Sequence, residues 1–444
     1  MVTPASIKEV KYNKNNSNKN QILNLLNKNI KDEDKYIDSK SFQQLANGLF
    51  QAEGHIGGYF ELNQTSYFRP ICYISVNATD ESVRLFRILN KNFDNKLKYI
   101  ISLNKSGLYH IRIQTRDWNL IVNKWIPYFS LAHGDKLRGL KYLLKVYYIQ
   151  YSNDKNDIDS IIKKLTLIYN IVDNNQRKIS LTDKIKLVLN HSYPDYNINN
   201  INYNIYNDYL IHELPKEHNE MSIPFILGFY LGDGTFNIKI RDEGTLLWYI
   251  GVLRISQKYT EDNEKLFILI SDYLNTYDLD TIIRPFKEGT VIVLKVESNQ
   301  NIKKLSKLLH VYEEFYFIKK DQLYFMNKSS KLLGLVKYWK EGNIVLLNLI
   351  SEYNLNYRVK NDTKYKYYLN KIEEGFKNQS DLYFLSKVGI EGYLVKLPIK
   401  IKPKTKYFYY KTYNKDKDLT LKTALDYRDR MLNLYLIEND LIKS

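Results

Sequence analysis

Two acidic residues occupy matching places in a repeated sequence, and their side chains are the best suited to catalysis. Glu53 precedes Gly54 at the end of ANGLFQAEG, and Asp233 precedes Gly234 at the end of ILGFYLGDG. The two acids are 180 positions apart (233 minus 53). Carboxylates, water and phosphate oxygens are the ligands that hard Mg²⁺ prefers. Since a single GDG tripeptide is usually only a turn, the prediction of a metal site depends on the duplication.

The residues around each acid predict two helices that pack closely together. Gly48 and Ala52 are four positions apart, as are Gly228 and Gly232, and small residues at this spacing clear one helix face for a neighbouring backbone. Each acid then falls in the last turn, where the helix dipole disfavours a negative charge by ~0.3–1 kcal/mol. If the small faces pack together, both carboxylates meet at one end of the interface, where a bound cation relieves their repulsion. Such a cation can activate water for phosphodiester hydrolysis.

The repeat continues beyond these helices. ICYISVNATDESVRLF aligns with GVLRISQKYTEDNEKLF at an offset of 181, and DKLRGLKYLL resembles SKLLGLVKYW, which pairs Lys136 with Lys331 at an offset of 195. Three landmarks in the same order indicate a duplication with a small insertion late in the second copy. Each copy reads as helix, strand, strand, helix, strand, strand, helix. We therefore predict an α+β fold of two pseudo-symmetric αββαββα halves, each an antiparallel sheet backed by helices.

Alternation along the strands predicts one buried face and one polar, basic face in each sheet. In the second copy Phe236, Ile238 and Ile240 alternate with polar residues, and the first copy repeats this pattern more weakly. A polar face of this kind is either a solvated sheet surface or a donor-rich surface that reads base edges in a major groove. The residues predicted to contact nucleic acid are Tyr59, Glu61, Asn63, Arg112, Gln114, Asn237, Lys239, Arg241, Arg254 and Lys258.

The composition is basic and contains almost no cysteine. The net charge of +17 favours a phosphate-bearing partner, although a codon bias toward Lys, Asn, Ile and Tyr also produces a basic chain. Cys72 is the only cysteine, which excludes an internal disulfide and CxxC zinc sites. No run of ~18 apolar residues is present, so no membrane span is expected.

The two acidic segments resemble the signature helices of LAGLIDADG homing endonucleases, and the resemblance extends over roughly residues 40 to 340. It implies that Glu53 and Asp233 bind the catalytic divalent cations, Mg²⁺ or Mn²⁺. It also implies that the two sheets form a saddle over a long double-stranded DNA site, with the metals above the minor groove. Both strands would be cut, leaving short 3′ overhangs. Because both motifs lie in one chain, a monomer is expected.

The resemblance nominates further catalytic residues. Many members carry a lysine after the fourth strand of each half, for which Lys136 and Lys331 are the candidates, with Lys328 as an alternative in the second half. The other interpretation is an ordinary phosphate-contacting or solvated lysine. ISQK resembles a family segment whose glutamine lies near the active site, which nominates Gln257. The first half has ISVN there and so places Val76 opposite Gln257.

The first half departs from the family pattern at a second place. His55 stands where a small residue is usual. Together with Val76, this residue makes the two active sites unequal, and the expected consequence is biased nicking or reduced activity.

The predicted organisation has five parts. These are a flexible polar arm (1–36), half 1 (37–155), a helical linker (156–217), half 2 (218–350) and a C-terminal extension (351–444). The extension offers two strand-like runs and a helix, similar to small AP2-like modules, in which Lys396, Lys400, Lys402 and Lys406 would face phosphate. The alternative interpretation is a helix and hairpin that only extend half 2.

The resemblance predicts a site-specific homing endonuclease, encoded within an intron, that makes a metal-dependent double-strand cut in DNA. The alternative is an intron RNA maturase, or a structural RNA-binding protein on the same scaffold, with the host intron RNA as partner. Family habit and composition predict a mitochondrial, organelle-encoded protein, with the plastid as alternative. One sequence does not encode the target site, because such sites depend on water-mediated contacts and DNA shape.

Overall fold

Two four-stranded antiparallel sheets have the same strand order, β1-β2-β4-β3 and β5-β6-β8-β7. The computed structural model describes residues 16–61, 67–105, 107–153, 157–171, 180–197, 201–202, 206, 218–242, 246–286, 288–336, 339–353, 362–377, 384–389, 391–398 and 401–442. The strands of half 1 are β1 (Gly54–Glu61), β2 (Tyr67–Asn77), β3 (Lys98–Leu103) and β4 (Tyr109–Thr115). The strands of half 2 are β5 (Gly234–Asp242), β6 (Leu247–Lys258), β7 (Ile282–Phe286) and β8 (Val291–Glu297).

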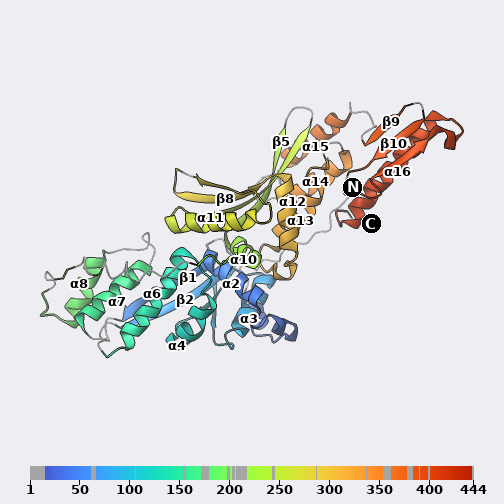
Figure 1. The fold of residues 1–444 in the computed structure, drawn as a ribbon. Coiled ribbons are helices and arrows are strands. Elements are labelled where there is room, and N and C mark those ends of the chain that lie inside the picture. Colours follow the sequence, from blue (N-terminus) through green and yellow to red (C-terminus); the bar gives the residue numbers. More distant parts are fainter. Residues whose placement is uncertain are drawn as a thin grey trace.

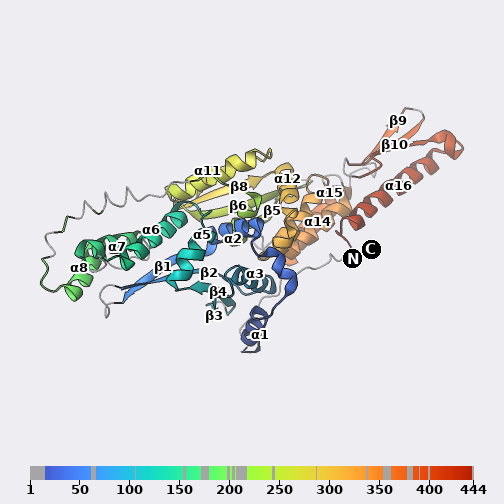
Figure 2. The ribbon, with the colours of Figure 1, turned by 60° about the horizontal axis from the view of Figure 1, so that its bottom comes forward.

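The helices follow the predicted αββαββα order in both halves. Half 1 contains α2 (Lys40–Glu53), α3 (Asp80–Lys91), the short segments α4 (Trp118–Leu120), η2 (Ile121–Trp125) and α5 (Ile126–Tyr128), and α6 (Gly134–Tyr151). Half 2 contains α10 (Ile223–Asp233), α11 (Glu261–Asn275), α12 (Asn299–His310), η5 (Glu313–Phe315), α13 (Lys320–Leu332) and α14 (Lys340–Tyr353). Helices α2 and α10 lie near the centre of the molecule, with one sheet on either side of the pair (Figures 1 and 2). The predicted fold class is thereby confirmed.

Local sequence explains where the two central helices begin. Ser39 caps α2 by accepting a hydrogen bond from the Phe42 amide, and Ser222 caps α10 by accepting one from the Phe225 amide. Pro224 stands in the first turn of α10, where its missing N–H would have no helical partner in any case. Buried aromatic residues on both helices then join a hydrophobic core that is continuous between the halves.

The prediction of a flexible arm is wrong for residues 16–36. This segment forms α1 (Asn16–Leu26), which packs on α3, and η1 (Lys31–Tyr36). Glu33 is buried and accepts a hydrogen bond of 2.7 Å from Arg87 Nε, and a second bond from the same guanidinium. Tyr36 is also buried, with its ring centre 5.7 Å from that of Phe315. Residues 1–15 of the predicted arm lie outside the described residues.

The predicted linker contains two helices, α7 (Ile158–Ile171) and α8 (Leu181–Ser192). Helix α7 packs on α6 and on α8. Helices α7 and α8 share a small hydrophobic core of their own, which includes Leu165 and Leu189. Both helices lie at the end of the molecule opposite to the C-terminal extension (Figures 1 and 2).

The C-terminal extension forms α15 (Asp362–Lys377), β9 (Leu385–Val388), β10 (Gly392–Lys396), β11 (Thr405–Tyr409), η7 (Tyr410–Tyr413) and α16 (Lys417–Glu438). The strands make an antiparallel sheet of order β11-β10-β9, and α16 packs on β10 and β11. Phe408 fixes this packing through a ring contact of 5.5 Å with Tyr427. The extension is therefore a small sheet with a packing helix, and its likeness to AP2-like modules stays a prediction.

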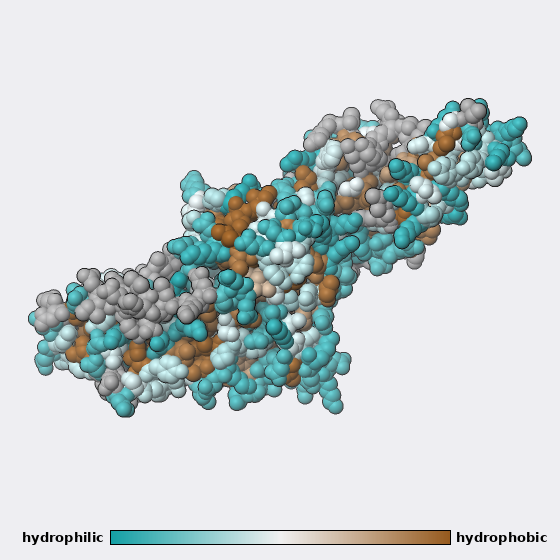
Figure 3. All heavy atoms as spheres, in the orientation of Figure 1, coloured by the Kyte–Doolittle hydropathy of each residue, from teal (hydrophilic) through white to brown (hydrophobic). Residues whose placement is uncertain are grey.

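The face of the molecule in Figure 3 is mostly hydrophilic, with a hydrophobic patch over the region where Figure 1 draws β8 and α11. Exposed apolar side chains in these parts include Ile268 on α11 and Ile282 and Phe286 on β7. Within the described residues, no helix combines the length and the apolar character needed to cross a membrane.

Candidate active site and nucleic-acid interface

Helices α2 and α10 touch backbone to backbone. A Cβ added at Gly48 would lie 1.9 Å from the Phe225 carbonyl oxygen, and a Cβ at Gly228 would lie 1.9 Å from the Leu45 carbonyl oxygen. Leu45 and Phe225 are themselves matching residues of the repeat, 180 positions apart. The contact is therefore symmetric, and it leaves no room for any side chain at either glycine.

The symmetric contact brings both acidic residues to the same end of the helix pair. A Cβ added at Gly232, the residue before Asp233, would lie 3.1 Å from Glu53 Cγ. Burial raises the pKa of Glu53, and burial together with the neighbouring Glu53 charge raises the pKa of Asp233 to about 6. Lys319 and Lys136 act in the opposite direction on both carboxyl groups. The two negative charges are thus close enough to repel each other.

This arrangement fits a hard divalent cation. Two partly buried carboxylates that repel each other gain from a cation between them, and oxygen ligands suit Mg²⁺ or Mn²⁺. Among the described residues no group of three or more His, Cys, Asp and Glu side chains could hold a metal ion. Water and substrate oxygens would therefore complete the coordination of a cation held by the two carboxylates, as is usual for Mg²⁺.

One lysine from each half reaches the C-terminal end of a central helix. Lys136 Nζ donates to the Gly54 carbonyl oxygen. Lys319 Nζ donates to the carbonyl oxygens of Gly232 and, at 2.8 Å, Gly234. Lys319 is therefore the counterpart of Lys136, and it was missed by the sequence analysis.

The predicted pairing of Lys136 with Lys331 is wrong. Lys331 Nζ donates over 3.3 Å to the Asn439 carbonyl oxygen, while Tyr435 donates to the Lys331 carbonyl oxygen. Lys331 thus lies where α13 meets the C-terminal extension. The alternative, Lys328, is a buried residue of α13. Lys319 and Lys136, by contrast, each lower the pKa of both Glu53 and Asp233.

Gln257 contacts one of the two carboxylates. Its Nε2 donates a hydrogen bond to Asp233 Oδ2. The strand register pairs Gly234 with Ile255 and Gly54 with Ile74, so Val76 is the residue of half 1 that matches Gln257. Val76 is buried in the core, and its side chain has no polar atom to offer Glu53.

A pocket of about 350 Å³ lies beside Glu53 in half 1. His55, Tyr73 and Arg112 line it. The His55 ring stacks on Tyr73 at 4.6 Å, and the Arg112 guanidinium lies 4.1 Å from the centre of the same ring. Burial, aided by Lys136 and Arg112, lowers the pKa of His55 to about 4. A neutral imidazole therefore stands next to the carboxylate in half 1.

The predicted nucleic-acid contacts fall on one face of each sheet. In half 1, Tyr59 is exposed on β1. Arg112 and Gln114 lie two positions apart on the same face of β4, where they pair with Ser75 and Tyr73 of β2. Glu61 ends β1, but its side chain and all of Asn63 lie outside the described residues. In half 2 the face is formed by Asn237, Lys239 and Arg241 on β5 and Arg254 and Lys258 on β6.

Two further cations of half 2 share this face and were missed. Lys295 on β8 pairs with Arg254 on β6. Arg284 on β7 pairs with Val293, which lies two residues before Lys295 on β8 and on the same face. Lys295 and Glu297 alternate with the apolar residues Leu294 and Val296 along β8, and this sequence signal could have identified Lys295.

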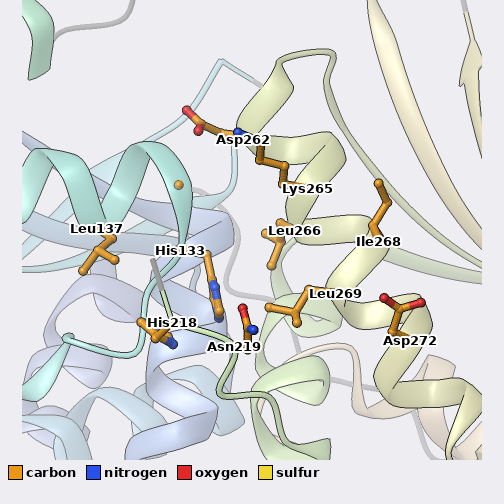
Figure 4. Close-up of a pocket in the computed structure, with 11 residues that line it drawn as sticks. His133, Leu137, His218, Asn219, Asp262, Lys265, Leu266, Ile268, Leu269 and Asp272 are labelled. Atoms are coloured by element: carbon orange, nitrogen blue, oxygen red, sulfur yellow. The ribbon is translucent and has the colours of Figure 1, made fainter. Parts of the chain in front are cut away.

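A second pocket, of about 280 Å³, lies between α6 and α11, where the halves meet (Figure 4). His133 and His218 face each other there with ring centres 4.4 Å apart. His218 Nε2 lies 3.1 Å from the Ala132 carbonyl oxygen, and Arg138 forms an ion pair with Asp262 across the junction. This pocket therefore belongs to the junction between the halves.

The comparisons with known proteins point to one fold. No protein-family model matches the sequence, and neither does any curated protein. Among solved structures, the chain is similar to the meganuclease I-SmaMI bound to uncleavable DNA, with 16% identity and a TM-score of 0.53 over 70% of this chain and 97% of that chain. It is also similar to the I-LtrWI LAGLIDADG homing endonuclease bound to target DNA, with 17% identity and a TM-score of 0.52 over 71% of this chain and 99% of that chain. I-SmaMI bound to uncleaved DNA in the presence of calcium ions matches with 16% identity and a TM-score of 0.51, over 70% of this chain and 97% of that chain.

Proposed function

Because this chain has the LAGLIDADG homing endonuclease fold, we propose that it is a site-specific endonuclease that makes a metal-dependent double-strand cut in DNA. The observation that carries this proposal is the convergence of Glu53 and Asp233 at one end of the α2–α10 pair, with Lys136 and Lys319 beside them. A structural role alone does not explain two partly buried carboxylates that repel each other. The solved structures compared above contain uncleavable DNA in one case and uncleaved DNA in another.

In this proposal Glu53 and Asp233 hold Mg²⁺ or Mn²⁺. When bound, such a cation polarises the scissile phosphate and a water molecule and neutralises negative charge that develops in hydrolysis. Gln257 fixes the orientation of the Asp233 carboxylate through its hydrogen bond. Lys136 and Lys319 add one positive charge from each half next to the carboxylates, where they can stabilise the negative charge of the attacked phosphate.

The substrate of this proposal is a long double-stranded DNA site lying across both sheets. The polar faces carry Arg, Lys, Asn and Gln, which donate to base edges in the major groove, together with the cations needed for phosphate contact. Since one chain holds both halves and both carboxylates, we expect it to act as a monomer. We also expect it to be encoded within an intron in mitochondrial DNA, with plastid DNA as the alternative.

The C-terminal sheet is proposed as an additional DNA contact. Tyr407 and Tyr409 are exposed on the edge strand β11, with their rings 5.9 Å apart and nearly parallel. Of the four lysines predicted to face phosphate, Lys400 lies outside the described residues, whereas Lys396, Lys402 and Lys406 are exposed. Exposed aromatic rings among lysines suit nucleic-acid binding. Removal of both tyrosine rings should weaken DNA binding without slowing cleavage at saturating protein, and unchanged binding would refute this contact.

The central experiment is cleavage of a plasmid that carries the DNA flanking this reading frame, joined without the frame or its intron. The reaction is run with Mg²⁺, with EDTA, and with the variants Glu53→Gln and Asp233→Asn. We expect a discrete double-strand cut that EDTA and either variant abolish. No cut, with binding of the host intron RNA that both variants retain, would instead support the maturase or structural RNA-binding role.

A further inference from the structure

The polar faces of the two sheets do not match in charge. Superposing the strand registers gives six matched pairs in which half 2 has a cation and half 1 has none. Two of them, Arg241 with Glu61 and Lys258 with Asn77, lie at or next to the ends of their strands. The other four, with half 2 first, are Lys239 and Tyr59, Arg254 and Tyr73, Arg284 and Ile100, and Lys295 and Gln114. We refer to the half 2 cations of these four pairs as the cationic cluster.

The cationic cluster is crowded and only partly compensated. Lys295 is 4% exposed, and burial together with Arg284, Lys239 and Arg254 lowers its pKa. Glu297 pairs with Lys239 at 2.8 Å and is the one carboxylate that influences Lys295. Arg254 Nε is buried and has no hydrogen-bond partner within the described part of the chain. Four cations with one carboxylate leave an excess of positive charge that an anionic ligand would relieve.

The cations on the face of half 1 are fewer and two of them lie against aromatic rings. They are Arg69, Lys98 and Arg112, among the described residues. Arg69 lies 4.8 Å from the centre of the Tyr67 ring, and Arg112 lies 4.1 Å from the centre of the Tyr73 ring. A guanidinium over an aromatic ring already has a favourable electrostatic partner. Half 1 therefore offers a weaker electrostatic attraction to phosphate than half 2.

We propose that half 2 anchors the DNA, with the cationic cluster bound to backbone phosphates, and that half 1 contributes fewer phosphate contacts. This inference rests on the proposed function only in taking duplex DNA as the ligand, and it does not require cleavage. Phosphate contacts release counterions, so each one lost reduces the slope of log affinity against log salt by ~0.9. A cluster that reads base edges would instead alter sequence preference with little change in that slope.

The test exchanges matched residues between the halves. One triple variant gives half 2 the residues of half 1 (Lys239→Tyr, Arg254→Tyr, Lys295→Gln), and the other gives half 1 the residues of half 2 (Arg69→Ile, Lys98→Ile, Arg112→Val). Each removes three cations, so a general effect of net charge is the same in both. Binding of a fluorescent duplex of arbitrary sequence is measured by anisotropy in EDTA between about 50 and 200 mM salt.

We expect the half 2 triple to lose about two to three units of slope and at least tenfold in affinity at low salt, and the half 1 triple to lose less than a third of that. Equal losses would overturn the inference, as would a loss of affinity at unchanged slope. Thermal melting checks that both triples fold. The pair Arg284→Gln and Lys98→Gln repeats the comparison on exposed residues of the edge strands β7 and β3, where folding is not at risk.

The outcome also separates this inference from the proposed function. If the wild-type protein binds duplex DNA and the two triples lose affinity equally, only the anchoring inference fails. If the wild-type protein does not bind duplex DNA at all, the proposed function fails with it.

Discussion

Gln257 Nε2 donates a hydrogen bond to Asp233 Oδ2, whereas Val76, the matching residue in half 1, cannot donate to Glu53. A donor to a carboxylate favours its ionised form and fixes its orientation. Gln257 accordingly lowers the pKa of Asp233, although burial and Glu53 raise it more strongly. The two acids are therefore held by different means, and the half 1 acid stands instead beside the pocket lined by His55 and Arg112.

Gln257→Val should slow the cutting of one DNA strand and leave the other strand at its wild-type rate. The variant copies the half 1 arrangement into half 2, so that both acids lack this hydrogen bond, and loss of a hydrogen bond to a charged group costs about 1.5–3 kcal/mol. We therefore expect cleavage of one strand to slow by about tenfold or more relative to the wild-type protein. A duplex labelled on each strand in turn measures both rates, and Val76→Ile serves as the control. Equal slowing of both strands would show that Gln257 does not act on one carboxylate alone.

Lys319→Met should reduce the rate of cleavage by about 10²-fold, since a positioned charge at the reacting phosphate contributes on that scale. Lys331→Met is the matched control, near the end of the helix that Lys319 caps, and we expect it to retain the wild-type rate. Single-turnover kinetics at saturating protein separate this effect from a loss of DNA binding. If Lys331→Met slows cleavage and Lys319→Met does not, the assignment made from the structure is wrong.

The sequence predicted the central helices, both sheets and their polar faces because these elements repeat with nearly constant spacing. Lys319 was missed because DKLRGLKYLL and SKLLGLVKYW are similar in composition. That similarity led to the pairing of Lys136 with Lys331, although the two lie at different distances from the end of the fourth strand. The distance from the end of the fourth strand was the better guide. Lys136 follows Thr115 by 21 residues, and Lys319 follows Glu297 by 22.

The ordered N-terminal segment could not be predicted from local pattern. KDEDKY has the composition of a flexible polar arm, and its order depends on contacts with distant residues. Arg87, which pairs with Glu33, lies 54 positions away, and Glu314, which accepts a hydrogen bond from the Tyr36 hydroxyl, lies 278 positions away. A buried charge is tolerated only with such a partner, and a single sequence does not show which arginine supplies it.

Gly228→Ala should destabilise the protein strongly and disturb the active site. The new methyl group would overlap the Leu45 carbonyl oxygen, which belongs to backbone and cannot turn aside, so α2 and α10 must move apart. We expect the free energy of unfolding to fall by about 3 kcal/mol, at the upper end of overpacking costs, as measured by urea denaturation. Gly107→Asn is the control, because nothing lies within 4 Å of a Cβ there and its φ of +79° suits asparagine. Wild-type stability in Gly228→Ala would contradict the close helix contact.

Acid should loosen the junction between the halves through His133, whose pKa burial and the neighbouring His218 lower to about 4. The folded protein therefore keeps this ring neutral, while the unfolded chain binds a proton near pH 6.5. Between these values the unfolded state holds more protons, so stability present above pH 6.5 is lost as the pH falls toward 4. The shift corresponds to a loss of up to about 3 kcal/mol.

His133→Phe keeps an aromatic ring against Phe225, which lies 5.2 Å away, but removes the titrating group. Unfolding free energies of the two proteins, measured from pH 7 to pH 4, should diverge, with the variant losing less stability. Carboxylates elsewhere in the chain titrate in both proteins, so the difference between the curves isolates His133. Parallel curves would mean that His133 takes up its proton in the folded state as readily as in the unfolded chain, and the junction would then not be sensitive to acid at this residue.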